Sequence, residues 1–350
     1  ARHVPGLAVT VVQRDRQLTG KGYGVADTET MRPVDPGATL FDVQSVAKLV
    51  VATSAVIAAE KGSVDLDADV NQYLEGFELP STHEDPITLA ALLTHTSGLE
   101  DRGTGITSQA LAEVPAIGSF LMRTLTQRVA PPFQDLVYSD QGMTLAAFAV
   151  QTAAGIPFDE YARLNVFEPL GMNDTHYLDV PEELKQHQAR SYSFEDGQLV
   201  PIQHHYWNIW PSSSLWTTAK DMSRFVSLHL SGGSLDGVRL LSKDATERLH
   251  TRHFSYHPEM AGVCLGFFER VENGHRLLIH SGGGSGFLSE MMLLPEEGVG
   301  YFLAYNGYDG SLISAFRSAF LDRFYPAQHE TLINTVNLDA AELDAYEGWY

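Results

Sequence analysis

The sequence feature that most constrains the fold is a stretch of apolar residues without a polar face. Residues 49–59 are apolar on every side of a helical wheel, which is typical of a helix enclosed in a domain core. We predict that this helix begins near Ser45, continues to about Lys61 and ends at Gly62. The rest of the chain therefore has to fold around it.

A lysine lies in the first turn of this helix, where a charged side chain is unusual and requires an explanation. Lys48 follows Ser45 by three residues, so both side chains lie on one face, within hydrogen-bond reach of each other. Burial lowers the pKa of an amine, and a neutral amine can accept the serine proton. We therefore predict that Ser45 is a nucleophile and Lys48 its base, with the unpaired N–H groups of the helix start favouring negative charge.

The Ser-x-x-Lys pair alone also fits an incidental arrangement, because it arises by chance in chains of this length. Its position is less common. Of the six lysines, only Lys48 has a serine three residues before it and stands at the start of an apolar helix. Other motifs must decide between the two interpretations.

The composition limits which kinds of molecule the protein can bind. The 350 residues, 44% of them hydrophobic, suffice for one large domain or for two lobes that share a cleft. A formal net charge of -21 disfavours nucleic acid and anionic membranes, which would be repelled, and favours a cationic or neutral small molecule. No apolar run is long enough to span a membrane. The sequence decides neither the compartment nor the oligomeric state.

Cysteine and histidine usage argues against a metal centre. Cys264 is the single cysteine, which excludes an intrachain disulfide and a Cys-rich zinc site. The fourteen histidines form no His-Glu-x-x-His motif. We therefore expect neither a metal nor a cofactor.

Strand-like runs lie at both ends of the chain, with helical patterns between them. Residues 7–13 and 18–25 read as a hairpin, and the runs 262–271, 275–280, 286–294 and 298–306 precede a helix at 313–324. Further helical patterns cover residues 87–93, 117–127, 142–154, 158–167 and the segment that ends at 230. We predict an α/β (α+β) fold, in which one antiparallel sheet from both chain ends is flanked by helices and an all-helical lobe is inserted.

Two further motifs can reach a shared cleft. Residues 138–140 (Tyr-Ser-Asp) lie between a proline-containing loop and a helix, where Tyr138 can point into a cleft or serve as a rim or core aromatic. Residues 280–284 (His-Ser-Gly-Gly-Gly) end a strand. A phosphate-binding loop is excluded there, because residues 287–294 read as a strand rather than as a helix. The glycines instead allow another backbone, or a substrate, to approach the strand closely.

In this order, the three motifs resemble those of the penicillin-recognising serine hydrolases. The family pattern is Ser-x-x-Lys, then Tyr-x-Asn, then Lys-Thr-Gly or His-x-Gly, and this chain looks like the class C β-lactamase branch with its DD-peptidase, D-aminopeptidase and esterase relatives. The likeness extends from about Val4 to Phe324. Its flanks include the runs 4–9, 22–27, 92–99 and 219–222.

The resemblance implies an α/β lobe (about 1–65 and 215–325) beside a helical lobe (about 66–214), with the site in the crevice between them. It implies that Ser45 is acylated, that Lys48 helps to remove its proton, and that Tyr138 passes the proton to the leaving group. A Gly-x-Ser-x-Gly elbow is absent, which counts against an α/β-hydrolase.

The third motif would form the opposite wall of the site. The resemblance implies that His280 lines this wall and that the backbone N–H groups of Ser45 and Gly283 form the oxyanion hole. Each such donor is typically worth ~3–4 kcal/mol to the transition state. The residues that we predict to contact substrate are Asp140, Ser281, Gly282, Trp207 and Trp210.

Two positions depart from the family pattern. Asp140 replaces an asparagine, which removes an amide donor and places a carboxylate near Lys48. We expect this change to favour substrates with a free amino group, or esters. His280 replaces the lysine that holds a substrate carboxylate in many members, so we do not expect efficient β-lactam hydrolysis.

Two segments have more than one interpretation. The aromatic residues Tyr206, Trp207, Trp210 and Trp216 fit core packing, which we favour, or a substrate pocket. Residues 326–350 read as a linker and either a simple C-terminal cap or the start of a lipocalin-like domain that follows the hydrolase domain in some relatives.

The sequence thus predicts a serine hydrolase that acts on a small amide or ester, or on a peptide, including one with D-amino acids. An acyltransferase or a peptide-cyclising thioesterase would use the same acyl-enzyme with another acceptor. A penicillin-binding sensor or scaffold would be acylated without turnover. All the proton-handling residues are present, which favours an enzyme.

Overall fold

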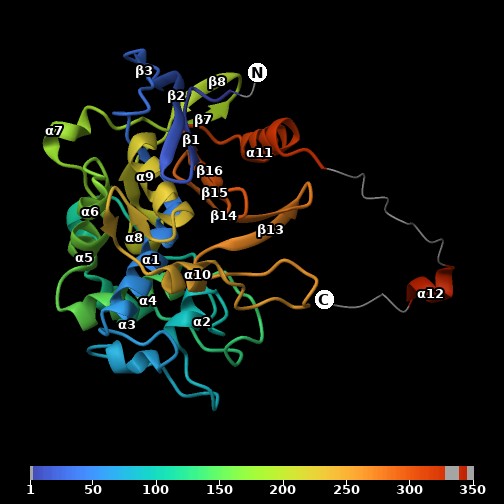
Figure 1. The fold of residues 1–350 in the computed structure, drawn as a ribbon. Helices are drawn as coiled ribbons and strands as arrows, with labels where there is room; N and C mark the ends of the chain where they lie inside the picture. The colour runs from blue at the N-terminus through green and yellow to red at the C-terminus, as the bar shows by residue number, and fades with distance from the viewer. Residues whose placement is uncertain (1–2, 328–338, 345–350) are drawn as a thin grey trace.

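Strands from the two ends of the chain lie side by side in one seven-stranded antiparallel sheet (Figure 1). The structure is a computed structural model that describes residues 3–327 and 339–344. The strand order is β13-β14-β15-β16-β1-β2-β3. Leu7 of β1 pairs with Tyr305 of β16 on one side and with Tyr23 of β2 on the other. The predicted sheet from both chain ends is confirmed.

The large sheet differs from the prediction at one of its edges. Its strands are β1 (Gly6–Gln13), β2 (Arg16–Asp27), β3 (Arg32–Pro33), β13 (Phe268–Glu272), β14 (His275–Gly284), β15 (Phe287–Leu294) and β16 (Val299–Tyr305). The predicted strand 262–271 begins only at Phe268, because Gly266, with a φ of +79°, turns the chain just before it. β14 continues past His280 to Gly284, because its glycines stay paired with β15.

Shorter strands connect the rest of the chain. One three-stranded sheet has the order β4 (Phe41–Asp42), β10 (Leu215–Thr217) and β6 (His176–Tyr177). The two-stranded pairs are β5 (Thr107–Ser108) with β9 (Tyr206–Trp207), β7 (Tyr192–Glu195) with β8 (Gln198–Pro201), and β11 (Ser234–Leu235) with β12 (Val238–Arg239).

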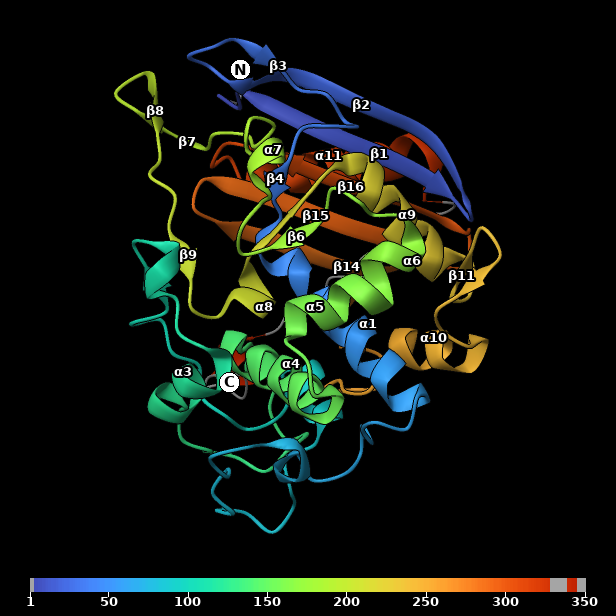
Figure 2. The same ribbon diagram turned by 90° about the vertical axis from the view of Figure 1, so that its left-hand side faces the viewer.

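Helices cover the sheet and fill the middle of the chain (Figure 2). They are α1 (Ala47–Glu60), α2 (Leu89–Leu93), α3 (Ile117–Thr124), α4 (Asp140–Ala154), α5 (Phe158–Ala162), α6 (Glu168–Leu170), α7 (Glu182–Lys185), α8 (Trp210–Ser213), α9 (Ala219–Leu230), α10 (Lys243–His250), α11 (Ser311–Phe324) and α12 (Ala340–Asp344). Three 3-10 turns, Gln44–Val46, Val70–Tyr73 and Leu111–Glu113, and a π-helical turn, Arg163–Phe167, complete the described elements.

The predicted central helix is buried on all sides. Every residue of α1 from Ala47 to Ala58 is buried, and the helix ends at Glu60, with Lys61 as its C-cap before Gly62, which has a φ of +73°. It packs against α4 and α8. The α-helix begins two residues later than predicted, because Ser45 lies in the 3-10 turn Gln44–Val46 that precedes it.

The large sheet buries both of its faces, because side chains alternate along each strand. Ala8 and Val12 of β1 pack in the core that contains α1 and α9. Val9, between them, packs in a second core with Phe320 of α11. Figure 1 shows α9 and α11 on opposite sides of the sheet.

The C-terminal prediction is largely untested by the structure. Residues 328–338 and 345–350, within the predicted linker and domain start, lie outside the described residues. Within 3–327 and 339–344, no helix is long and apolar enough to cross a membrane.

Candidate active site

The first motif forms the expected hydrogen bond. Lys48 Nζ lies 2.9 Å from Ser45 Oγ, because the 3-10 turn and the first turn of α1 bring the two side chains to one face. Lys48 is fully buried, whereas Ser45 is partly exposed and accessible from solvent.

The turn that carries Ser45 is held in an unusual conformation. Gln44 has a φ of +51°, a region that residues other than glycine adopt rarely. The carboxylate Oδ1 of Asp42 accepts hydrogen bonds from the N–H groups of Gln44 (3.2 Å) and Leu215 (3.3 Å). Burial raises the pKa of Asp42 to about 7. These bonds tie the nucleophile turn to β10 and fix the direction of Ser45.

The charge of Lys48 differs from the prediction. Nζ also bonds the backbone carbonyl of Ser212 (3.0 Å) and Oδ1 of Asp140 (2.5 Å), so all three protons of an ammonium group have acceptors. Burial alone would lower the pKa of Lys48, but the adjacent Asp140 and Tyr138 outweigh burial and raise it. The prediction of a neutral resting amine was therefore wrong, because Asp140 lies beside Lys48.

Tyr138 lies above this ammonium group. Lys48 Nζ is 4.9 Å from the centroid of the Tyr138 ring, and the tyrosine is 37% exposed. Backbone bonds hold its loop, since the N–H of Val137 donates to the carbonyl of His95 (2.8 Å) and the N–H of Ser139 donates to Nδ1 of His95 (3.1 Å). The His95 ring packs on Tyr138, with 4.4 Å between centroids.

His95 is a site residue that sequence reasoning did not single out. Because its Nδ1 accepts from a backbone N–H, its proton sits on Nε2. Burial, followed by the charge of Lys48, lowers the pKa of His95 to about 3, so the ring is neutral. The only sequence signal was its place in the 92–99 run of the family likeness. Two further residues of the site, Ser212 and Phe268, were not predicted from the sequence. The Ser212 carbonyl bonds Lys48, and the Phe268 ring lies 6.2 Å from that of Tyr138.

The third motif forms the wall opposite α4. His280 is buried, its ring centroid lies 6.3 Å from that of Tyr138, and its Nδ1 donates to the carbonyl of Ser281 (2.8 Å). The pKa of His280 is lowered to about 3, and burial is the largest cause. Electrostatic interactions with Lys48 and His95 add to this shift. This wall therefore presents a neutral imidazole where many family members have a lysine.

The glycines allow the close approach that the sequence predicted. A β-carbon on Gly282 would lie 2.2 Å from the carbonyl oxygen of Val43 and 3.0 Å from the backbone nitrogen of Ser45. Ser289, opposite Gly282 on β15, donates to the same Val43 carbonyl (2.7 Å). The nucleophile turn is thus docked directly onto β14 and β15. Gly283 is the next residue along β14.

Three of the predicted substrate contacts lie in different settings. The hydroxyl of Ser281 donates to Glu290 (2.9 Å), which belongs to a buried ion pair with Arg317, so this side chain is directed to the α11 side of the sheet. Trp210 is 5% exposed and packs on Tyr177 at 5.3 Å between centroids, so it is a core residue rather than a substrate contact. Trp207 is half-buried against the main core, and its Cζ2 is 3.1 Å from the β-carbon position of Gly284 at the end of β14.

A second carboxylate lies on the α4 wall. Asp101 accepts hydrogen bonds from the Ser139 hydroxyl (3.1 Å) and the Gln141 N–H (3.4 Å). Burial and then the charge of Asp140 raise the pKa of Asp101. The side chain of Asp140 is 23% exposed, so part of it reaches the cleft. Among the described residues, no group of three or more His, Cys, Asp or Glu could hold a metal ion.

The fold is the one shared by class C β-lactamases and penicillin-binding proteins of known structure. The sequence model of the Beta-lactamase family matches residues 1–321. The chain belongs to this family.

Known proteins resemble the chain over most of its length. It is 25% identical over 319 residues to the D-alanyl-D-alanine-carboxypeptidase/endopeptidase AmpH of Escherichia coli, covering 85% of this chain and 78% of AmpH. It is 27% identical over 335 residues to penicillin-binding protein 4 of Amycolatopsis lactamdurans, covering 87% and 81% of the two chains. The octameric penicillin-binding protein homologue from Pyrococcus abyssi superposes with a TM-score of 0.79 at 23% identity, covering 91% of this chain and 74% of that chain. This last likeness supports the fold alone.

Proposed function

We propose that the protein is a serine hydrolase that forms an acyl-enzyme on Ser45 and hydrolyses a small amide, peptide or ester. The observation that carries the proposal is the 2.9 Å hydrogen bond between Lys48 Nζ and Ser45 Oγ, on a turn docked against β14 and beside Tyr138. Membership of the Beta-lactamase family and the similarity to the carboxypeptidase/endopeptidase AmpH support a hydrolase.

Because Lys48 is held as an ammonium group and cannot accept a proton, we assign the proton relay to Tyr138. As Ser45 Oγ attacks the substrate carbonyl, its proton passes to the Tyr138 oxygen, and the Tyr138 proton passes to the leaving group. Lys48, held by Asp140 at 2.5 Å, keeps its charge and stabilises the negative charge that develops on Ser45 Oγ. Water then cleaves the acyl-enzyme through the same relay in reverse.

The tetrahedral intermediate needs donors for its oxyanion. We assign this role to the backbone N–H groups of Ser45 and Gly283, on the two elements that meet at Gly282. Each donor is expected to contribute ~3–4 kcal/mol to the transition state.

The charges of the cleft favour a substrate with an amino group. Asp140 and Asp101 place two carboxylates on the α4 wall against the single charge of Lys48. An ammonium group near the scissile bond would be attracted there, whereas the neutral His280 offers a substrate carboxylate no positive charge. We therefore assign aminoacyl amides and esters to this site and expect slow turnover of β-lactams, which carry a carboxylate.

A substrate panel on two serine variants tests the proposal. The panel combines p-nitrophenyl esters, D- and L-aminoacyl p-nitroanilides, their N-acetylated forms and nitrocefin, with intact mass spectrometry to detect the acyl adduct. We expect adduct and turnover in the wild type and neither in Ser45→Ala. Ser54→Ala, a buried serine of the same helix, is the matched control and should keep both.

The same panel separates the alternatives. Turnover that survives in Ser45→Ala would exclude the mechanism. A stable adduct without turnover would indicate a penicillin-binding sensor. A preference for N-acetylated over free aminoacyl substrates would contradict the role given to the two carboxylates.

A further inference from the structure

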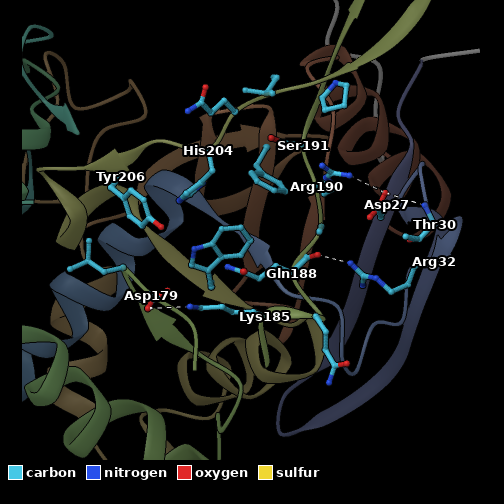
Figure 3. A pocket seen from close by; sticks show the side chains of 18 residues that line it. Asp27, Thr30, Arg32, Asp179, Lys185, Gln188, Arg190, Ser191, His204 and Tyr206 are labelled. Carbon is cyan, nitrogen blue, oxygen red and sulfur yellow. Dashed lines mark hydrogen bonds and ion pairs between the residues drawn. The ribbon is translucent and has the colours of Figure 1, made fainter. Parts of the chain in front are cut away.

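A second pocket lies beside the turn between β14 and β15 (Figure 3). Its volume is about 880 Å³, and its lining includes none of Ser45, Lys48, Tyr138 or His280. The lining comes from the end of β2, from β3 and the turn between them, from α7, from the segments 178–179, 188–191 and 201–206, and from the strands β10 and β15. A concave site of this size fits a small organic ligand.

One wall of this pocket is aromatic. The rings form a chain in which Tyr206 lies 5.0 Å from His204, His204 lies 5.5 Å from Trp216, and Trp216 lies 5.6 Å from Phe287. Burial, followed by the charge of His205, lowers the pKa of His204, so this ring is neutral. Such a wall binds a flat apolar group through packing and ring stacking.

The pocket as a whole has a net positive lining. Arg32, Lys185 and Arg190 line it together with two carboxylates, Asp27 and Asp179, which leaves a net positive charge. The whole chain has a formal charge of -21, so this lining has the opposite sign to the chain as a whole. An anion is therefore attracted to this pocket more than to the average surface.

Arg32 differs from the other two basic residues. Arg190 pairs with Glu29, and Lys185 pairs with Glu182 at 2.9 Å. Arg32 is half-buried and donates to the backbone carbonyls of His187 and Gln188, and within the described residues it forms no ion pair with a carboxylate. A guanidinium has five N–H donors, so two carbonyl acceptors leave donors for a bidentate anion.

We propose that this pocket is a second binding site, separate from Ser45, for a small carboxylate with an aromatic group. The carboxylate bonds the remaining N–H groups of Arg32, and the aromatic group packs on Tyr206 and His204. Figure 3 shows Arg32 and Tyr206 at opposite ends of the pocket with His204 between them, so the ligand must carry its charge and its ring at separate ends. An ω-phenylalkanoate, with its carboxylate and its ring at the two ends of a methylene chain, has this form.

Binding of 6-phenylhexanoate tests the site. Its affinity is measured by calorimetry and compared with that of its neutral amide and of acetate, which lacks the ring. We expect one saturable site for the acid, at least tenfold weaker binding of the amide and of acetate, and weaker binding of the acid at high salt. Equal affinities for the acid and the amide would overturn the proposal.

Two arginine variants locate the ligand. Arg32→Gln should weaken binding of the acid at least tenfold and leave the amide unchanged. Arg239→Gln is the matched control, because Arg239 also donates to two backbone carbonyls, of Gly232 and Leu241, but lies outside this pocket. An unchanged affinity in Arg32→Gln would overturn the assignment.

Two further measurements cover folding and the neighbouring site. If Arg32→Gln lowers the melting temperature, the Tyr206→Ala variant is measured instead. Weaker binding of the acid with unchanged binding of acetate would support the proposed site. Unchanged binding of both ligands would refute it. Enzyme labelled on Ser45 by a fluorophosphonate, verified by mass, should bind the acid as before. Loss of binding on labelling would place the ligand in the catalytic cleft instead.

Discussion

The two walls of the candidate active site hold different kinds of group. On the wall formed by α1 and α4, Lys48 and Asp140 are charged and 2.5 Å apart. On the wall formed by β14, His280 is neutral and is followed by glycines. The charge that activates Ser45 in our proposal is thus confined to one wall, which leaves the other wall to decide what kind of substrate fits.

The most severe test of the charged wall is removal of its cation. Lys48→Met should reduce the rate of fluorophosphonate labelling and of ester hydrolysis roughly 10³-fold or more, because the developing charge on Ser45 loses its partner. Lys61→Met, at the exposed far end of the same helix, should keep the wild-type rates. A loss below tenfold in Lys48→Met would mean that the charge is not required.

A pair of glycine variants tests the strand wall. Gly282→Ala places a methyl group 2.2 Å from the Val43 carbonyl, so we expect a loss of activity of about 10²-fold or more and a lower melting temperature. Gly283→Ala, whose methyl group would meet only the flexible side chain of Leu288, keeps its backbone N–H and should retain most activity. Equal effects of the two changes would contradict the docking of the Ser45 turn on β14.

The neutral imidazole of the strand wall predicts a pH dependence of stability. Burial holds the pKa of His280 at about 3, against 6.5 in the unfolded chain, so below pH 6.5 the unfolded chain binds a proton that the folded protein does not. The free energy of unfolding should therefore fall by about 2 kcal/mol between pH 6 and pH 4.5 through His280. Well above pH 6.5, where the unfolded chain also carries a neutral His280, this contribution is constant.

His280→Gln isolates this effect, because glutamine does not titrate. Urea unfolding at a series of pH values should show a shallower loss of stability on acidification in the variant than in the wild type. Asp42, with its pKa raised to about 7, has the opposite dependence, and its contribution cancels because both proteins contain it. Parallel curves would show that His280 is not held neutral.

The smallest expected effect is a change in selectivity on the charged wall. Asp140→Asn restores the residue of the family pattern and removes one carboxylate beside Lys48. The ratio of kcat/KM for free aminoacyl over N-acetylated p-nitroanilides should fall about tenfold, equivalent to ~1.4 kcal/mol. An unchanged ratio would show that Asp140 serves Lys48 and not the substrate.

The parts of the site that the sequence predicted depend on local geometry or on the family likeness. Three residues of helix bring Ser45 and Lys48 together wherever the helix lies. The close approach at Gly282 followed from glycines at a strand, and the pairing of β1 with β16 followed from strand-like runs at both chain ends.

The parts that failed depend on distant residues. The charge of Lys48 is decided by Asp140, which the family resemblance had placed near it, and by the Ser212 carbonyl, which arrives from 164 residues away. A helical pattern carries no information about either contact. The sequence does not distinguish Trp210 from Trp207, but Trp210 is buried in the core and Trp207 is half-buried beside Gly284. Only the packing of α8 against α1 and α4 separates them.

The pairing of β1 with β16 has a consequence for the synthesis of the chain. The N–H of Gly6 bonds the side chain of Asn306, 300 residues further on, so β1 acquires one of its two neighbours only after these residues have been synthesised. Contacts of such long range make folding slow, and until then one edge of the nascent hairpin is open to other chains. A polypeptide that ends before β16 would keep that edge permanently and be prone to aggregate.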